Sequence, residues 1–226
     1  MPNFRFAASL LAATLLVPAA AAQTAPDQPA LAVAPAATTA PTCELHVWPA
    51  ARVSAMTQGA GASFGLLGTI IDSAAHADQN KRDSAFITGA LDAASQARVL
   101  RQLDLPTALH LPPSTVIIHE QGIDLKSDSP ARLSDSKAKC YNEFVVRSLF
   151  YSKSTVHKSQ MRTFLGVRGF DGDKVTIDFR DSRHEDLDVK LPKEGEDTGP
   201  ATDALLKAFK GDVAFFTDKF VKKNKL

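Results

Sequence analysis

The sequence predicts an α+β domain: an antiparallel-rich sheet of about four to five strands, with early helices and a C-terminal helix packed on it. Three observations predict this class. In the first half of the chain, apolar residues recur at steps of three and four, which is the period of a helix. In the second half the period changes to two, which is typical of strands. Near the end, a single apolar stripe returns at helical spacing.

Residues 1–22 have the composition of a secretory signal peptide. Arg5 is followed by an apolar run from 7 to 17 and then by small residues up to Ala22. This order predicts export with cleavage near Ala22 and Gln23, and hence a periplasmic or secreted chain. The apolar run is shorter than the roughly 20 residues that a membrane-spanning helix needs. No lipobox precedes Cys43, so we expect neither a lipid anchor nor a transmembrane span in the mature chain.

Residues 23–42 are rich in alanine, proline and threonine, with Asp27 as their single charge. Proline disfavours helix and sheet, and too little bulky apolar surface is present to offset the entropy of ordering, so we expect a disordered linker. Residues 43–226 then form a single α+β domain. Without Arg5, the mature chain carries one basic residue fewer than the 26 of the whole sequence, which equals its 25 acidic residues. This balance argues against nucleic acid as a partner.

Cys43 and Cys140 are the two cysteines of the chain, and each opens a strand-like run, "CELHVW" and "CYNEFVVRSLFYS". In an exported chain, an even pair most simply forms a disulfide. A pair of free, buried thiols is the alternative. Two cysteines so far apart, without clustered histidines, match no zinc-site spacing, so no metal is expected.

The segment from 51 to 105 has helical composition in two parts. In the second part, five apolar residues share one helical face: Ile87, Leu91, Ala94, Ala97 and Leu100. Asp83 or Ser84 is expected to cap the start of this helix, after the polar break "DQNKR". The next segment, "LPTALHLPPS", predicts a short turn or helix, and the β-branched run "TVIIHE" predicts a buried strand.

The rest of the chain predicts a central strand, a hairpin and a last helix. "CYNEFVVRSLFYS" is apolar on both faces, which favours a central position. "QMRTFLGVRGF" and "KVTIDFR" flank the turn "DGD", and we expect Val175, Ile177 and Phe179 to face one way. Pro200 suits the first turn of the helix, whose apolar stripe is Leu205, Leu206, Phe209, Val213, Phe216 and Phe220. The lysines at its end complement the helix dipole or contact a membrane surface: Lys219, Lys222, Lys223 and Lys225.

The stretch "GAGASFGLLGTII", residues 59–71, looks most like a functional motif. Its glycines miss the dinucleotide-binding fingerprint by one residue, and no strand leads directly into them, so no nucleotide cofactor is expected. Gly61, Gly65 and Gly68 lie at helical spacing instead. We predict that residues 61–75 form a helix whose glycine side is a contact surface. A bend-prone loop is the alternative.

Catalytic signatures are missing from the sequence. The serine in "GAGASFG" lacks the nucleophile-elbow motif, and the scattered histidines lack the spacing of a helical metal site. Trp48 is expected to pack in the core or at its rim. Three polar residues are candidates to line a pocket on the sheet: His46, His119 and Glu143. Two of the three in one concave pocket, with a shifted pKa, would favour a ligand-binding or hydrolytic function.

The order "CELHVWPA", "GLLGTIIDSAAHADQNKRDS", "CYNEFVV", a hairpin and a C-terminal helix resembles uncharacterised exported proteins of Gram-negative bacteria over most of residues 43–222. More distantly, it is similar to the periplasmic α+β domains of curli-export-type lipoproteins and other outer-membrane assembly factors. The chain differs from these lipoproteins in lacking an acylated cysteine. The resemblance implies interaction or assembly work in the cell envelope and supplies no functional residues.

Two functions are therefore weighed. The first is a non-enzymatic periplasmic protein that binds an envelope protein or outer-membrane component through Gly61, Gly65 and Gly68 and the adjoining sheet edge, with homo-oligomerisation left open. The second is a small-ligand-binding protein or hydrolase with a pocket on the sheet. Neither function has catalytic residues or a cofactor assigned to it by the sequence.

Overall fold

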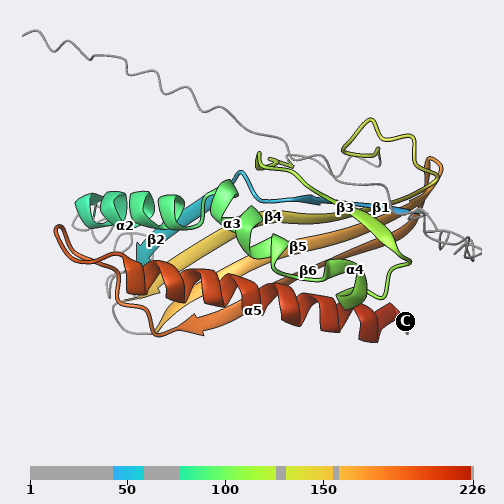
Figure 1. Ribbon diagram of the computed structural model, residues 1–226. Helices are drawn as coiled ribbons and strands as arrows, with labels where there is room; N and C mark the ends of the chain where they lie inside the picture. The colour runs from blue at the N-terminus through green and yellow to red at the C-terminus, as the bar shows by residue number, and fades with distance from the viewer. Residues whose placement is uncertain (1–42, 59–76, 126–130, 155–157, 225–226) are drawn as a thin grey trace, which may run out of the picture. The chain divides into compact units, whose positions relative to one another are not determined.

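Six strands form one mixed sheet in the computed structural model, which describes residues 43–58, 77–125, 131–154 and 158–224 (Figure 1). The strand order is β3-β1-β4-β5-β6, and β2 also pairs with β4. The strands are β1 Cys43–Trp48, β2 Val53–Gln58, β3 Ser114–Ile118, β4 Cys140–Ser154, β5 Ser159–Asp171 and β6 Lys174–Leu187. The helices are α2 Ala77–Ala90, α3 Ala93–Arg101, α4 Leu105–Ala108 and α5 Gly199–Asn224. The α+β class is confirmed.

The sheet is less antiparallel than the sequence predicts. Strand β1 pairs in parallel with β3 and β4, and β2 pairs in parallel with β4, whereas only the β4–β5 and β5–β6 pairs are antiparallel. The reason is the connection between strands: α2, α3 and α4 lie between β2 and β3, and a chain that crosses over through helices returns in the same direction. The expected four to five strands become six because "VSAMTQ", expected to be helical, is strand β2.

Strand β4 explains why β2 forms. It is 15 residues long, and its first part pairs with β1 while its last part, 149–154, pairs with β2. The pairing partner thus overrides the local helical composition of 53–58, because strand formation depends on the neighbouring strand more than on propensity. The central position predicted for 140–152 is confirmed, since β4 pairs with three other strands.

The predicted early helix is split into α2 and α3. Asp92 caps α3 by accepting a hydrogen bond from the Ser95 amide at 2.7 Å. The expected cap at Asp83 or Ser84 is wrong, because both residues lie inside α2. The Asp83 side chain is buried there and forms an ion pair with Lys153 at 3.6 Å.

Two smaller expectations about strands are also corrected. The run "TVIIHE" forms β3, but this is an edge strand of the described sheet and is only half-buried, with Val116 40% exposed. The predicted hairpin β5–β6 forms, and Gly172 takes the positive φ of 57° that its turn requires. A bulge near Gly169 turns Val175 to the face opposite Ile177 and Phe179.

The predicted C-terminal helix is confirmed as α5, which runs across one face of the sheet (Figure 1). Its apolar stripe packs on the sheet, where Phe216 contacts Phe144 edge-on with ring centroids 5.8 Å apart. Three of the four terminal lysines contact the chain itself. Lys219 pairs with Asp181, Lys222 pairs with Asp218, and Lys223 lies over the Phe179 ring; the fourth is outside the described residues.

The predicted disulfide between Cys43 and Cys140 is confirmed. These two residues are direct partners in the parallel β1–β4 pair, with Cα atoms 4.6 Å apart. The bridge therefore joins the starts of two neighbouring strands.

Several predictions fall on undescribed residues. They are the signal peptide 1–22, the linker 23–42 and the contact surface of Gly61, Gly65 and Gly68. Among the helices of the described segments, none combines the length and apolar character needed to cross a membrane.

Candidate functional site

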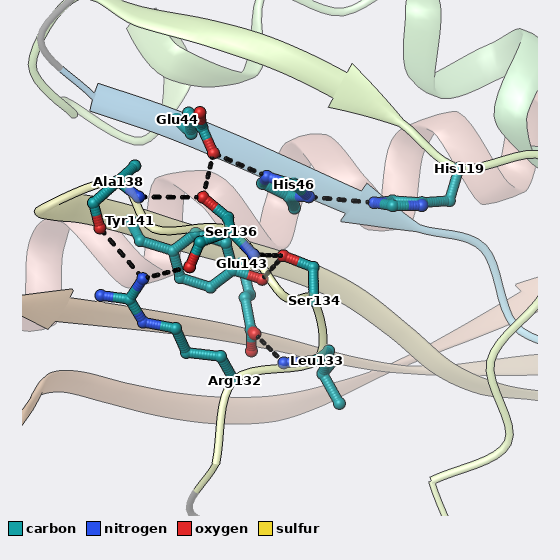
Figure 2. A network of polar contacts seen from close by, with 10 residues as sticks. All are labelled: Glu44, His46, His119, Arg132, Leu133, Ser134, Ser136, Ala138, Tyr141 and Glu143. Atoms are coloured by element: carbon teal, nitrogen blue, oxygen red, sulfur yellow. Dashed lines mark hydrogen bonds and ion pairs between the residues drawn. The ribbon is translucent and has the colours of Figure 1, made fainter. Parts of the chain in front are cut away.

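Helices cover one face of the sheet, and the opposite face carries a polar network. Alternation along β1 turns Leu45 and Val47 toward the helical core and turns Glu44, His46 and Trp48 the other way. The main apolar cluster lies on the helical face, while the opposite face carries the polar groups beside a smaller cluster of Trp48, Tyr141, Val145 and Phe170. Figure 2 shows this network.

The register of the parallel strands gathers the functional groups. His46 is paired with Ile117 in β3 and with Glu143 in β4, and paired residues of neighbouring strands point to the same face. His119 follows β3, and its amide donates to the Val47 carbonyl at 2.9 Å, which continues the ladder by one residue. The three residues proposed from sequence for a pocket, His46, His119 and Glu143, therefore lie on one face of the sheet.

A chain of hydrogen bonds links a carboxylate to two imidazoles. Glu44 Oε2 lies 3.0 Å from His46 Nε2, and His46 Nδ1 lies 3.0 Å from His119 Nε2 (Figure 2). The Ser136 hydroxyl donates to the same Glu44 oxygen at 2.5 Å. We call Glu44, His46 and His119 the relay.

The surroundings set the protonation states of Glu44 and His119. The pKa of Glu44 is lowered, first by the Ser136 hydrogen bond and then by the one from His46, so this carboxyl is ionised at neutral pH. The pKa of His119 is lowered, mainly because burial disfavours its charged form and also because of His46. His119 is therefore neutral at pH 7.

The order of donors and acceptors follows from these charges. The ionised Glu44 can only accept, so His46 Nε2 carries a hydrogen and donates it. When His46 is neutral, its Nδ1 accepts from Nε2–H of His119, which leaves Nδ1 of His119 as a lone-pair acceptor. No hydrogen bond from the described part of the chain reaches this last atom.

Beside the relay lies a shallow cleft of about 330 Å³, lined by Trp48 and by residues 119–123. The rings of Trp48 and His119 stack with centroids 4.2 Å apart and planes only 5° apart. The loop follows the chain after β1 closely, with the Ile123 amide donating to the Pro49 carbonyl at 3.0 Å. A Cβ at Gly122 would meet the Ala51 nitrogen at 2.5 Å, so glycine is required for this approach.

Glu143 lies on the same face as the relay but forms no hydrogen bond with it, and contacts Arg168 and Leu133 instead. It is fully buried; its Oε2 accepts from Arg168 Nε at 2.7 Å and its Oε1 accepts from the Leu133 amide at 2.6 Å. Removing one partner from such a buried pair costs about 3–5 kcal/mol. Glu143 thus fixes residues 131–139, which we call the covering segment, to the sheet, and it does not line the cleft.

Arg132 secures the same covering segment. Its guanidinium donates to the Ser136, Ala138 and Gly172 carbonyls and lies 4.7 Å from the centroid of the Tyr141 ring. Tyr141 accepts a hydrogen bond from the Ser134 hydroxyl at 2.9 Å, and burial raises the pKa of its phenol. These contacts attach the covering segment to the sheet near Ser136, whose hydroxyl donates to Glu44.

Sequence reasoning found two of the three relay residues and missed Glu44. The signal was present: in "CELHVW" a carboxylate, a histidine and a tryptophan alternate, and period two places them on one face of a strand. Trp48, expected in the core or at its rim, is 5% exposed and belongs to a buried cluster with Tyr141, Val145 and Phe170. Ser136 was out of reach, because its place depends on the fold of the covering segment.

The relay lacks a nucleophile among the described residues. Neither histidine has a serine or cysteine as a hydrogen-bond partner, and both cysteines form the disulfide. The described residues also contain no group of three or more metal-binding side chains.

Comparison with known proteins gives no family. No protein-family model matches the chain, and no curated protein matches it. A crystal structure described as an uncharacterized protein is similar with a TM-score of 0.26 and 9% identity, covering 80% of this chain and 91% of that one. A likeness of this size carries no argument about fold or function.

Proposed function

We propose that this chain is a small-ligand-binding protein whose site is the cleft beside Trp48 and His119. The observation that supports the proposal is the hydrogen bond between His46 and His119, which leaves a neutral His119 at the cleft. Ligand sites bring a few convergent polar groups together in a concave surface, often with shifted pKa values.

The relay defines the complementary ligand chemistry. Nδ1 of His119 is an acceptor at neutral pH, so the ligand offers a hydroxyl or amine hydrogen. The stacked indole beneath His119 limits rotation of the imidazole and holds its nitrogen in place. Below the lowered pKa of His119 the same nitrogen becomes a donor, so binding weakens as pH falls through that value and stays constant above it.

The site is tested with the fluorescence of Trp48, the single tryptophan of the chain. Monosaccharides, amino acids and polyamines form the panel, and each compound that changes the emission is measured by calorimetry. We expect His119→Ala to weaken binding by at least ~10-fold, because a hydrogen bond to a fixed acceptor is lost. His184→Ala, at an exposed position of β6, is the matched control. A panel without binders, or equal loss in both variants, would refute the proposal.

We also propose that the chain acts after export, in the periplasm or outside the cell. A disulfide persists in oxidising compartments and is rare in the cytosol, and Cys43–Cys140 supports this location.

Association with another envelope component remains a separate proposal. Its contact residues Gly61, Gly65 and Gly68 lie outside the described residues, while the exposed Val116 on edge strand β3 supports its sheet-edge part. Affinity capture from envelope extracts tests it with the wild-type chain and Gly65→Leu. Loss of one specific partner at unchanged melting temperature supports association, and unchanged capture contradicts it.

A further inference from the structure

A second cleft lies between α2, the end of β4 and the segment that follows β6. Its volume is about 500 Å³, and it shares no lining residue with the cleft beside the relay. Three separate parts of the chain meet there: Arg82 comes from α2, Lys153 from β4, and the segment after β6 contributes 190–194. The size falls within the range of small-molecule sites.

The charges in this cleft are strongly unbalanced. Four cations line it, Arg82, Lys153, Lys190 and Lys193, against the single carboxylate of Glu194. The chain as a whole is nearly neutral, with 26 basic and 25 acidic residues, so the local excess is a property of this site. A concave surface lined by one sign of charge concentrates ions of the opposite sign.

Three of the four cations are available to a ligand. Lys153 is held by the buried carboxylate of Asp83 at 3.6 Å. For Arg82, Lys190 and Lys193, no ion pair occurs with any carboxylate in the described segments; Arg82 donates only to the Gln79 amide oxygen, at 3.2 Å. Like charges that line one cleft repel one another, and an anion between them relieves the repulsion.

The cleft has a fixed wall as well as charges. Leu191 is 6% exposed and belongs to the helical core, so the chain between Lys190 and Lys193 is anchored there. Pro192 restricts the backbone next to it. On the opposite wall, the Gln79 side-chain amide donates to Asp83 at 2.6 Å. The oxygen of the same Gln79 amide accepts from Arg82. Contacts within the chain therefore fix the backbone of both walls.

We propose that this cleft binds a multiply charged phosphate group. A guanidinium and two ammonium groups in one concavity match the several anionic oxygens of a phosphate better than the single charge of a carboxylate. Two sources share this chemistry, a soluble phosphorylated compound and a phosphomonoester on a lipid headgroup. The exposed position of the three cations lets either one reach them.

The test uses the exported chain and two probes, inorganic pyrophosphate by calorimetry and phosphatidylcholine vesicles with or without phosphatidic acid by sedimentation. The variant Lys190→Gln/Lys193→Gln removes two cations from the cleft. The control Lys207→Gln/Lys210→Gln removes two exposed cations from α5, so the net charge changes equally. We expect the cleft variant to bind pyrophosphate at least ~10-fold more weakly and the control to bind as the wild type does.

The outcomes separate the sources. Loss of pyrophosphate binding in the cleft variant, without vesicle binding by the wild type, identifies a soluble ligand. Vesicle binding that requires phosphatidic acid and disappears in the cleft variant identifies the lipid headgroup. Absence of binding to both probes, or equal weakening in the control, overturns the proposal. Trp48 fluorescence with the ligands of the relay cleft stays unchanged in both variants, so failure here leaves the first proposal intact.

Discussion

Asp212 on α5 is a carboxyl group that the chain buries completely between helix and sheet. The Thr163 hydroxyl of β5 donates to it at 2.5 Å, and Glu185 and Arg183 of β6 act on it electrostatically. Its pKa is raised from 3.8 to about 7; burial is the largest cause, Glu185 also raises the value, and Thr163 and Arg183 lower it. Near neutral pH this group is partly protonated.

The first prediction concerns Asp212→Asn. Because the folded-state pKa lies above the unfolded one, the contribution of Asp212 to stability is fully present below pH 3.8 and is lost as pH rises to about 7. Asparagine mimics the protonated acid at every pH. We therefore expect similar stability at pH 4 and a gain of about 2–4 kcal/mol for the variant at pH 8, from about 1.4 kcal/mol per pKa unit. Urea denaturation at both pH values measures it, and parallel pH profiles of the two proteins would contradict it.

At the scale of elements, β4 organises the sheet, since it pairs with β1, β2 and β5. The disulfide ties β1 to the first residue of β4 and closes a loop with a sequence separation of 97. A cross-link over so long a loop removes much conformational freedom from the unfolded chain.

The second prediction is that Cys43→Ala/Cys140→Ala lowers the free energy of unfolding by about 4–5 kcal/mol, as the chain-entropy model gives for a loop near 100 residues. Guanidinium denaturation compares the variant with the wild type, each with and without dithiothreitol. Reductant should lower the wild-type midpoint to that of the variant and leave the variant unchanged. A wild-type midpoint that ignores reductant would contradict the prediction.

How far the sequence predicts each element depends on where its stabilising contacts lie. Helix α5 and the β5–β6 hairpin are predictable because their apolar period and the turn at Gly172 are local. Strand β2 is not, because it exists by pairing with residues about one hundred positions away. In the candidate site, His46 and His119 are identifiable by residue type, but their contact depends on the parallel β1–β3 register, which no local pattern contains. Asp212 lies within an apolar stripe, and its partner Thr163 is 49 positions away in sequence.

At the scale of the whole chain, the third prediction is that the exported protein begins at Gln23 and carries no lipid. The tripartite order of residues 1–22 and the missing lipobox lead to this expectation. The intact mass of the protein from a periplasmic extract decides the matter, with an Ala20→Arg/Ala22→Arg variant as a control for blocked cleavage. A mass that retains residues 1–22, or an added acyl chain, would contradict it.

The parallel pairing of β1 with β4 also sets an order of events for a chain that folds while it emerges from its N-terminus. Strands β4, β5 and β6 are neighbours in sequence and can pair as soon as they emerge, whereas β1 has no partner until β3 and β4 have followed it. During that interval the thiol of Cys43 is unpaired, because Cys140 has not yet emerged. With only two cysteines in the chain, no wrong bridge can form within one molecule; the hazard is a bridge to a second copy. A low local concentration of nascent chains therefore favours the native disulfide.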